Sequence, residues 1–305
     1  MTDSALERFD RLRVEPLLPV ASRQGGFRGF WYSLQSIASR RQLLGLLIRR
    51  DIKARYKDSV LGLLWTLINP IVQLTVYYIV MGQFLGAARG IDNFAIYIFS
   101  GLTIYGLFSE TLSGSTASIV ANAGLVKKVY VPREIFPLAT VGSALFTFAV
   151  QLGVLVLACI ILGAAPFTWS IFYFIPSLVI VVVYGTALGL LLSALNVYLR
   201  DVQYLTQVLL MLAMWASPIV YGWTMVNSVF TQFSFPAWLL QVYTNNPVTL
   251  AVLGFHKAFW IDGTPADYPE GLAVRMVVAI LIGVVLIWVF QRVFARLQGN
   301  FAQEL

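Results

Sequence analysis

Long stretches without a charged residue constrain what this chain can fold into more than any other feature. Residues 135–199 are 65 consecutive positions without Asp, Glu, Lys or Arg, and residues 202–256 are another 55. A helix needs about 20 apolar residues to cross a hydrocarbon layer about 30 Å thick. Charged residues make up only 11% of the chain, against about 25% in soluble domains. The sequence therefore predicts an all-α integral membrane protein.

Six apolar runs are predicted to be transmembrane helices. The long run at 135–199 holds two of them, because the Gly-Ala-Ala-Pro sequence at 163–166 indicates a tight turn between two helices. The other four begin near Leu61, Phe94, Gln203 and Leu272 and end, where an end is defined, near Gly86, Val120 and Phe290.

The region before the last predicted span is apolar but irregular. Pro236 and Pro247 interrupt residues 235–262, which are too short for two more ordinary crossings. Non-helical backbone survives at membrane depth only where protein or water covers it. We interpret the region as a re-entrant or interfacial helical pair, with two further crossings as the alternative.

Basic residues are unevenly divided between the two sides of the six spans. Of the 21 Lys and Arg residues, 18 fall on the side of both termini, and Arg89, Lys257 and Arg275 fall on the other. Cytoplasmic loops carry such an excess. We therefore expect both termini to lie in the cytoplasm. Because the cations concentrate in the first 57 residues, they favour contact with anionic membrane lipids rather than nucleic acid.

Residues 1–57 form the predicted cytoplasmic arm, and residues 58–305 form the membrane domain. Within the arm, residues 43–57 have the period of an amphipathic helix, with Leu44 and Ile48 on one face. Asp51 and Arg55 are four residues apart, which suits a helical ion pair. This pair could lie at the lipid headgroups or face the protein. The opposite face carries the cations Arg49, Arg50, Lys53 and Lys57.

The second predicted cytoplasmic segment, residues 124–137, contains three cations and two prolines. The prolines prevent one continuous helix from joining the second and third spans. Its cations could be ordinary membrane anchors, or the segment could dock another protein.

Glu110 lies within the second span, where a carboxylate costs about 2.5–3.5 kcal/mol on insertion scales. It could mark a transport pathway or be a hydrogen-bonded structural group. Aromatic residues, 14% of the chain, could stack on sugar rings, although packing explains most aromatic residues in membranes.

Enzymatic chemistry has little support in the sequence. None of the five lysines follows a glycine, which excludes the Gly-Lys of a phosphate-binding loop. His256 and Cys159 are the only histidine and cysteine, so no zinc cluster or Ser-His-Asp triad is predicted. Any ATP would have to be hydrolysed by a partner.

Several motifs stand out between Leu43 and the C-terminus. They are RRDIKARYKDSVLGLLWTLINP at residues 49–70, GLVKKVYVPREIFP, NVYLRDVQY, ASPIVY, the pair Asn246-Pro247 and FARLQGNFAQEL. Together they resemble the permease subunits of ABC-2 type exporters, which move lipid-linked O-antigen, teichoic acid, capsular or cell-wall galactan polysaccharides. The resemblance is strongest in residues 49–70. The family often has Arg after the aromatic residue that follows the pair Asn246-Pro247, whereas here His256 and Lys257 follow Phe255.

The resemblance implies a half-transporter in the bacterial plasma (inner) membrane. Two copies would form a homodimeric channel for the lipid-linked polysaccharide, and two ATPase subunits would bind ATP and magnesium, so no cofactor is expected in this chain. The implied sites are the ATPase-coupling residues Lys127, Lys128, Tyr130, Pro132, Arg133, Glu134, Arg200 and Asp201; the gate-helix residues Arg49, Arg50, Asp51, Lys53, Arg55 and Tyr56; and the glycan-path candidates Tyr78, Tyr105, Phe108, Glu110 and Trp215.

Three alternatives remain at this stage. An ABC-2 permease could carry another lipid or a drug. An ion-coupled secondary transporter would also fit broken helices, although intramembrane charge is scarce and we find no internal repeat. A polytopic glycosyltransferase or acyltransferase lacks support from clustered acids or histidines.

Overall fold

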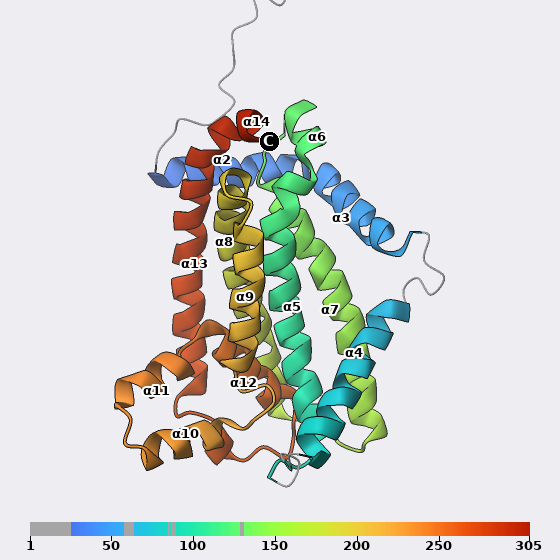
Figure 1. The fold of residues 1–305 in the computed structure, drawn as a ribbon, viewed down its shortest axis with the longest axis vertical. Coiled ribbons are helices and arrows are strands. Elements are labelled where there is room, and N and C mark those ends of the chain that lie inside the picture. Colours follow the sequence, from blue (N-terminus) through green and yellow to red (C-terminus); the bar gives the residue numbers. More distant parts are fainter. Residues whose placement is uncertain (1–25, 58–63, 85, 87–89, 129–130) are drawn as a thin grey trace, which may run out of the picture.

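The computed structural model describes residues 26–57, 64–84, 86, 90–128 and 131–305, and every regular element within these ranges is a helix. The helices form an elongated bundle with α5 (Phe94–Ala121) at its centre (Figure 1). One end, which we call the basic end, carries the C-terminus and four elements: α2 (Gly26–Ser39), α3 (Arg41–Tyr56), α6 (Ala123–Lys128) and α14 (Phe301–Glu304).

Among the residues that the structure describes, five helices are long and apolar enough to cross a membrane. This agrees with five of the six predicted spans. They are α4 (Trp65–Tyr77) continued by the π-helical η2 (Tyr78–Phe84), α5, α7 (Ile135–Ile161), α8 (Phe174–Tyr198) preceded by η4 (Trp169–Tyr173), and α13 (Leu272–Leu297) with the flanking 3-10 turns η5 (Pro265–Asp267) and η6 (Gln298–Asn300).

The fifth predicted span is a shorter helix than the sequence led us to expect. It is α9 (Val202–Trp215), whose 14 residues are about 21 Å long and therefore less than the hydrocarbon thickness. The chain then continues as irregular backbone through Pro218 to Gly222. The hydroxyl of Tyr97 lies 2.9 Å from the carbonyl oxygens of both Pro218 and Tyr221, so polar groups of this irregular segment are satisfied inside the protein.

The tight turn predicted at 163–166 is present between α7 and η4. Gly163 has a φ of +72°, a left-handed conformation that glycine adopts without the penalty a Cβ would bring. The amide of Ala164 donates to the carbonyl of Cys159 at 2.9 Å, which ends α7 in the manner typical of a helix followed by glycine.

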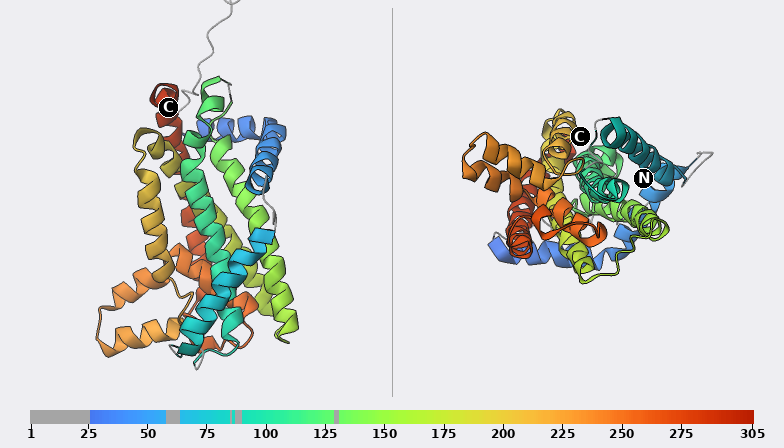
Figure 2. Two further views of the ribbon diagram at one scale, coloured as in Figure 1. Left: turned by 45° about the vertical axis from the view of Figure 1, so that its right-hand side comes forward. Right: turned by 90° about the horizontal axis from the view of Figure 1, so that it is seen from below.

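In the described part of the chain, three short helices precede α13 at the opposite end of the bundle, which we call the far end. They are α10 (Trp223–Gln232), α11 (Ala237–Thr244) and α12 (Pro247–Phe259). Two of them, α11 and α12, fall within residues 235–262, where a helical pair was predicted, whereas α10 was not predicted. Helices α10 and α11 project from the bundle on the side away from α4, whereas α12 is buried against the core (Figures 1 and 2). The Asn246 side chain accepts from the amide of Val248 at 3.0 Å and caps α12, with Pro247 in the first turn.

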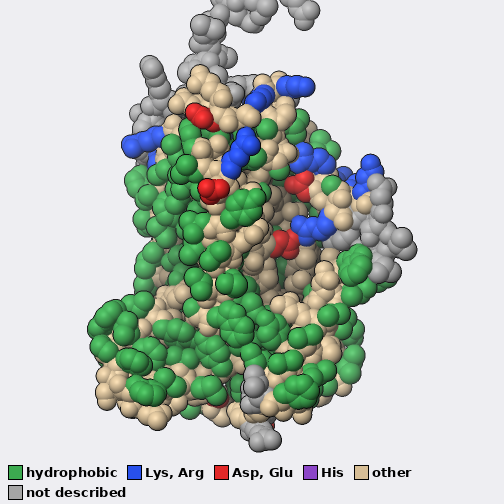
Figure 3. Space-filling model, in the orientation of Figure 1, with side chains coloured by type: hydrophobic (Ala, Val, Ile, Leu, Met, Phe, Trp, Pro, Cys, Tyr) green, Lys and Arg blue, Asp and Glu red, His purple; other side chains and the backbone are tan. Residues whose placement is uncertain are grey.

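The basic end has its own hydrophobic cluster, separate from the main core. Leu47 of α3, Ile135 of α7, Phe294 of α13 and Phe301 of α14 are buried in it. The apolar face of α3 therefore packs on the protein. Helix α2 was not predicted from the sequence. Figure 3 shows Lys and Arg side chains gathered at this end of the molecule.

Candidate functional site

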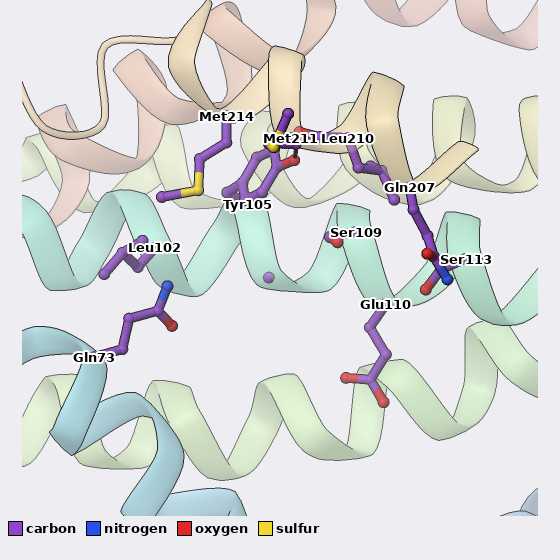
Figure 4. Close-up of a pocket in the computed structure, with 11 residues that line it drawn as sticks. Gln73, Leu102, Tyr105, Ser109, Glu110, Ser113, Gln207, Leu210, Met211 and Met214 are labelled. Carbon is purple, nitrogen blue, oxygen red and sulfur yellow. Dashed lines mark hydrogen bonds between the residues drawn. The ribbon is translucent and has the colours of Figure 1, made fainter. Parts of the chain in front are cut away.

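A groove runs between α4, α5 and α9 and is open on its remaining side. Its volume is about 620 Å³. Figure 4 shows residues of these three helices around it, with α5 forming the floor between the other two. The lining residues are Gln73 from α4, Leu102, Tyr105, Gly106, Ser109, Glu110 and Ser113 from α5, and Gln207, Leu210, Met211 and Met214 from α9.

Uncharged polar side chains and flexible apolar ones share this lining. Gln73 and Gln207 reach it from the two flanking helices, while Ser109 and Ser113 are four residues apart on α5. Residues four apart lie on the same helix face, so both serines face the groove. Apart from Glu110, the lining carries no formal charge. Such a surface offers weak hydrogen bonds and apolar contacts instead of a tight polar site.

A second hollow of about 500 Å³ continues the groove toward the basic end. It lies between α3, α5 and α7, and Glu110 and Ser113 line both hollows. Together the hollows follow α5 from Leu102 to Asn122. Twenty residues of helix rise about 30 Å, which matches the thickness of a hydrocarbon layer. In Figure 3 this face is hollowed below the charged side chains at the upper right.

An ion pair lies where the two hollows meet. Arg55 Nη1 of α3 contacts Glu110 Oε1 of α5, and it also donates to Thr147 Oγ1 of α7 at 2.9 Å. The helical pair predicted between Asp51 and Arg55 is wrong. Asp51 instead accepts from its neighbour Arg50, with Nη2 at 2.7 Å, because Arg55 reaches across to the bundle. Glu110 is therefore held by a cation from the arm.

The five glycan-path candidates are not brought together. Tyr105 and Glu110 line the groove, and the Tyr105 hydroxyl donates to the carbonyl of Leu210 on α9. Phe108 is buried in the main core. Tyr78 in η2 and the Trp215 side chain at the end of α9 are exposed outside the groove lining.

The coupling candidates divide into exposed and buried groups. Lys127 and Lys128 at the end of α6 are exposed, as are Arg200 and Asp201 in the turn between α8 and α9. Tyr130 lies outside the described residues. Pro132 is half-buried, and its carbonyl accepts from the amide of Ile135 at the start of α7. Arg133 and Glu134 are buried, so their side chains face the chain's own interior. The Arg133 guanidinium lies 5.5 Å from the centre of the Phe301 ring.

The gate-helix residues fall largely on the exposed side of α3. Arg49, Arg50, Lys53 and Arg55 are exposed and Asp51 is half-buried; the Tyr56 side chain lies outside the described residues. Opposite them, Ile48 packs so closely on α7 that a Cβ at Gly142 would collide with its Cδ1 atom. This close approach fixes α3 beside the second hollow.

His256 and Lys257, which follow Phe255 on α12, are both held within the far end. His256 is fully buried on α12, and its ring lies 3.9 Å from that of Tyr97 on α5. Lys257 Nζ lies 4.4 Å from the Tyr173 ring centre and 5.3 Å from that of Tyr268. The cation is thus placed over two aromatic faces.

Sequence reasoning missed most of the groove. Gln73, Gln207, Ser109 and Ser113 were not singled out, although polar residues inside apolar spans are a recognised signal of a pathway. Met211 and Met214 carried no such signal. Within the described residues we find no group of His, Cys, Asp and Glu side chains that could hold a metal ion.

Comparison with known proteins adds an independent finding. The family described as "ABC-2 type transporter" matches residues 42–260, more than two thirds of the chain. The match extends from α3 to the end of α12 and includes all helices around the groove.

Three similar proteins each align with most of the chain. An O-antigen export system permease protein of Myxococcus xanthus is 28% identical over 265 residues, which are 87% of this chain and 96% of that protein. Its counterpart in Klebsiella pneumoniae is 26% identical over 264 residues, 86% and 95% of the two chains. A polysialic acid transport protein of Escherichia coli is 22% identical over 245 residues, 79% and 90% of the two chains.

Proposed function

Because the chain belongs to the ABC-2 type transporter family, we propose that it is the membrane subunit of an ATP-driven exporter of a lipid-linked polysaccharide. The similar permeases carry O-antigen and polysialic acid in their names, and this supports a polysaccharide as the substrate. Export proceeds from the cytoplasm across the bacterial plasma membrane.

The basic end faces the cytoplasm in this proposal. Exposed cations of α3, α6 and the turn after α8 gather there with the C-terminus, whereas Lys257 and Arg275 belong to the far end. Cytoplasmic surfaces of membrane proteins carry the excess of Lys and Arg. We also count α9, with the irregular segment after it, as a crossing, which brings the total to six, and assign α10 and α11 to the membrane interface at the far end.

The groove along α5 is the observation that carries the proposal. A long polymer cannot be enclosed in one closed pocket, so it needs a path through which successive sugar rings slide. The two hollows share Glu110 and Ser113 and together follow α5 for about 30 Å. The groove between α4, α5 and α9 offers mainly weak contacts, which break easily at each step, and the second hollow adds the charged side chains of α3 near the basic end. This geometry favours a sliding polymer over a tightly bound small molecule.

One chain supplies only part of the wall of such a path. Apolar side chains on both flanks of the groove are exposed, among them Ile71 and Val72 on α4 and Leu205 and Leu209 on α9. Two copies that face each other along these flanks would bury them and enclose the path. We therefore propose a homodimer, with the remaining exposed apolar surface in contact with membrane lipids.

ATP hydrolysis belongs to a partner subunit, which would hold ATP and magnesium. The sequence has no Gly-Lys dipeptide for a phosphate-binding loop. Lys127 and Lys128 of α6, together with Arg200 and Asp201, form an exposed charged surface at the basic end. We propose that two ATPase subunits dock there, one on each copy. Arg133 and Glu134 support this surface from inside.

Cysteine labelling tests the path directly. Ser113 is half-buried and lines both hollows, whereas Ser193 is fully buried in α8 and serves as the matched control. The native Cys159 is also fully buried. In membranes that contain the ATPase partner, Ser113→Cys should react with a water-soluble maleimide and Ser193→Cys should not.

A bulky maleimide on Ser113→Cys should stop ATP-dependent glycan export into inverted vesicles. Complete labelling with undiminished export would contradict the proposed path. Export of a labelled drug or a simple lipid in place of the glycan, blocked by the same modification, would identify a different substrate for the same path.

A further inference from the structure

A buried amide at the basic end joins three separate elements of the chain. Gln291, in the last turns of α13, is only 4% exposed. Its Nε2 donates to Ser33 Oγ of α2 at 2.9 Å and to Glu134 Oε1, just before α7, at 3.3 Å. Its Oε1 accepts from Nε of Arg292 at 2.8 Å and from Nη2 at 2.5 Å.

These contacts fix the orientation of the amide. The Nε2 group has two hydrogens, and each has an acceptor, while the oxygen faces a guanidinium. Turning the amide over would place its oxygen against the Glu134 carboxylate and its NH2 group against Arg292. Both contacts would then be repulsive. No apolar side chain of similar size can link an acid on one side to a cation on the other.

Glu134 depends on this amide because it is itself 4% exposed. Burial raises the pKa of the Glu134 carboxyl, and hydrogen bonds from its backbone and Gln291 oppose the rise, followed by the charges of Arg292 and Arg133. A buried carboxylate that loses a donor pays a desolvation cost, so it would shift to recover one. This contact therefore fixes the position of the start of α7 relative to the end of α13.

The second hydrogen bond of Gln291 Nε2 reaches Ser33 of α2, in the N-terminal arm. Ser33 lies in the middle of α2, which ends at Ser39, and α3 begins two residues later at Arg41. The amide of Arg40 donates to the carbonyl of Ile37 at 3.0 Å, and that of Leu44 donates to the carbonyl of Arg40 at 3.1 Å. This short joint connects α2 firmly to α3, which carries Arg55 to the groove.

We propose that Gln291 is a positioning residue that transmits movement of the segment 124–137 to α2 and α3. This inference rests on the proposed function, in which that segment docks the ATPase and α3 borders the groove. A displacement of Glu134 would move the amide, and the amide would move Ser33 with it. ATP hydrolysis at the basic end would thereby change the position of the helix that borders the path.

Hydrogen exchange on the complete complex tests this transmission. The complex of wild-type chain and ATPase is compared with and without ATP and vanadate. In the wild type, amides of residues 131–138 and of α2 should change exchange together. The two test variants are Gln291→Met and Ser33→Ala. Gln291→Met removes the hydrogen bonds to both Glu134 and Ser33, whereas Ser33→Ala removes only the one to α2. Gln298→Met is the control, since Gln298 lies in η6 beyond the junction and is half-buried.

In both test variants, residues 131–138 should still respond to ATP, and the response of α2 should be lost. Glycan exported per ATP hydrolysed should fall about fivefold, the factor that corresponds to one hydrogen bond. The Gln298→Met control should match the wild type. Ser33→Ala keeps the scaffold intact because Ser33 is only half-buried, so a folding defect in Gln291→Met leaves the test valid.

The outcomes separate this inference from the proposed function. An α2 that responds to ATP in Ser33→Ala and Gln291→Met as it does in the wild type would overturn the transmission role. So would a wild type in which residues 131–138 respond and α2 does not. Failure of the wild-type chain to bind any ATPase would instead refute the proposed function, and the transmission role with it.

Discussion

The ion pair between Arg55 and Glu110 should hold α3 against the bundle, and its contribution can be measured by a double-mutant cycle. Arg55→Met replaces the guanidinium side chain with an unbranched apolar one and so removes the charge. Glu110→Gln keeps the shape and removes the acid. In the native chain Thr147 also donates to Glu110, with Oγ1 and Oε1 3.2 Å apart, so Arg55→Met leaves the carboxylate with one neutral donor inside a membrane helix.

The magnitude follows from the exposure of the two side chains, which is 41% for Arg55 and 26% for Glu110. Fully exposed pairs contribute about 0.2–1 kcal/mol. Breaking a fully buried pair costs about 3–5 kcal/mol because the remaining charge is uncompensated. Since this pair lies between these limits, we expect Arg55→Met to cost about 2 kcal/mol and the coupling energy to be about 1–2 kcal/mol. The double variant should therefore lose less unfolding free energy than the sum of the losses in the two single variants.

The assay is reversible unfolding of the purified chain in mixed micelles, with a spin-label distance between α3 and α7 as a second readout. The pair Arg50 and Asp51 provides a matched control, because its side chains have nearly the same exposure, 44% and 24%, but lie next to each other on one helix. Its coupling should stay below about 0.5 kcal/mol. Single losses at Arg55 and Glu110 that add within about 0.3 kcal/mol, with an unchanged α3–α7 distance, would refute the reasoning.

Two further predictions concern the far end and the docking surface. Gly101→Ala should destabilise the chain by about 1–3 kcal/mol, because the added Cβ would lie 2.8 Å from Nε2 of the fully buried His256. Thermal unfolding measures this loss. The control is Gly153→Ala on α7, where a Cβ meets nothing within 4 Å, and it should be neutral or slightly stabilising. Equal stability of the two variants would contradict the packing described for His256. Reversing charge with Lys127→Glu and Lys128→Glu should weaken copurification of the ATPase at low salt while leaving the unfolding transition unchanged, since both side chains are exposed; undiminished copurification would show that α6 is only a membrane anchor.

Local sequence signals were enough to predict the long helices but not their partners. Charge-free runs and the turn at 163–166 identified the hairpin of α7 and α8, because hydrophobic length and glycine geometry are local properties. The span expected to begin near Gln203 contains a helix of only 14 residues, because the apolar run continues past Pro218 as irregular backbone. Hydropathy does not distinguish a helix from apolar backbone whose polar groups bond to distant side chains such as Tyr97.

Charged residues were predicted least well, since their partners are distant in sequence. Asp51 and Arg55 have helical spacing, yet Arg55 pairs with Glu110, 55 residues away, once α3 has packed on α7. Arg133 and Glu134 have the composition of a surface segment. They become buried only because α13 and α14 pack over them, which no local pattern encodes.

Reconstituted transport is the most direct test of the central claim. The chain and its ATPase subunit are placed in proteoliposomes with a lipid-linked O-polysaccharide on the side of the ATPase, and transfer of glycan to the lumen is followed after ATP is added. The account predicts ATP-dependent transfer that requires both subunits and continues when an ionophore removes the ion gradients. Transfer by this chain alone that is driven by an ion gradient, or ATP hydrolysis by the purified chain without a partner, would contradict it.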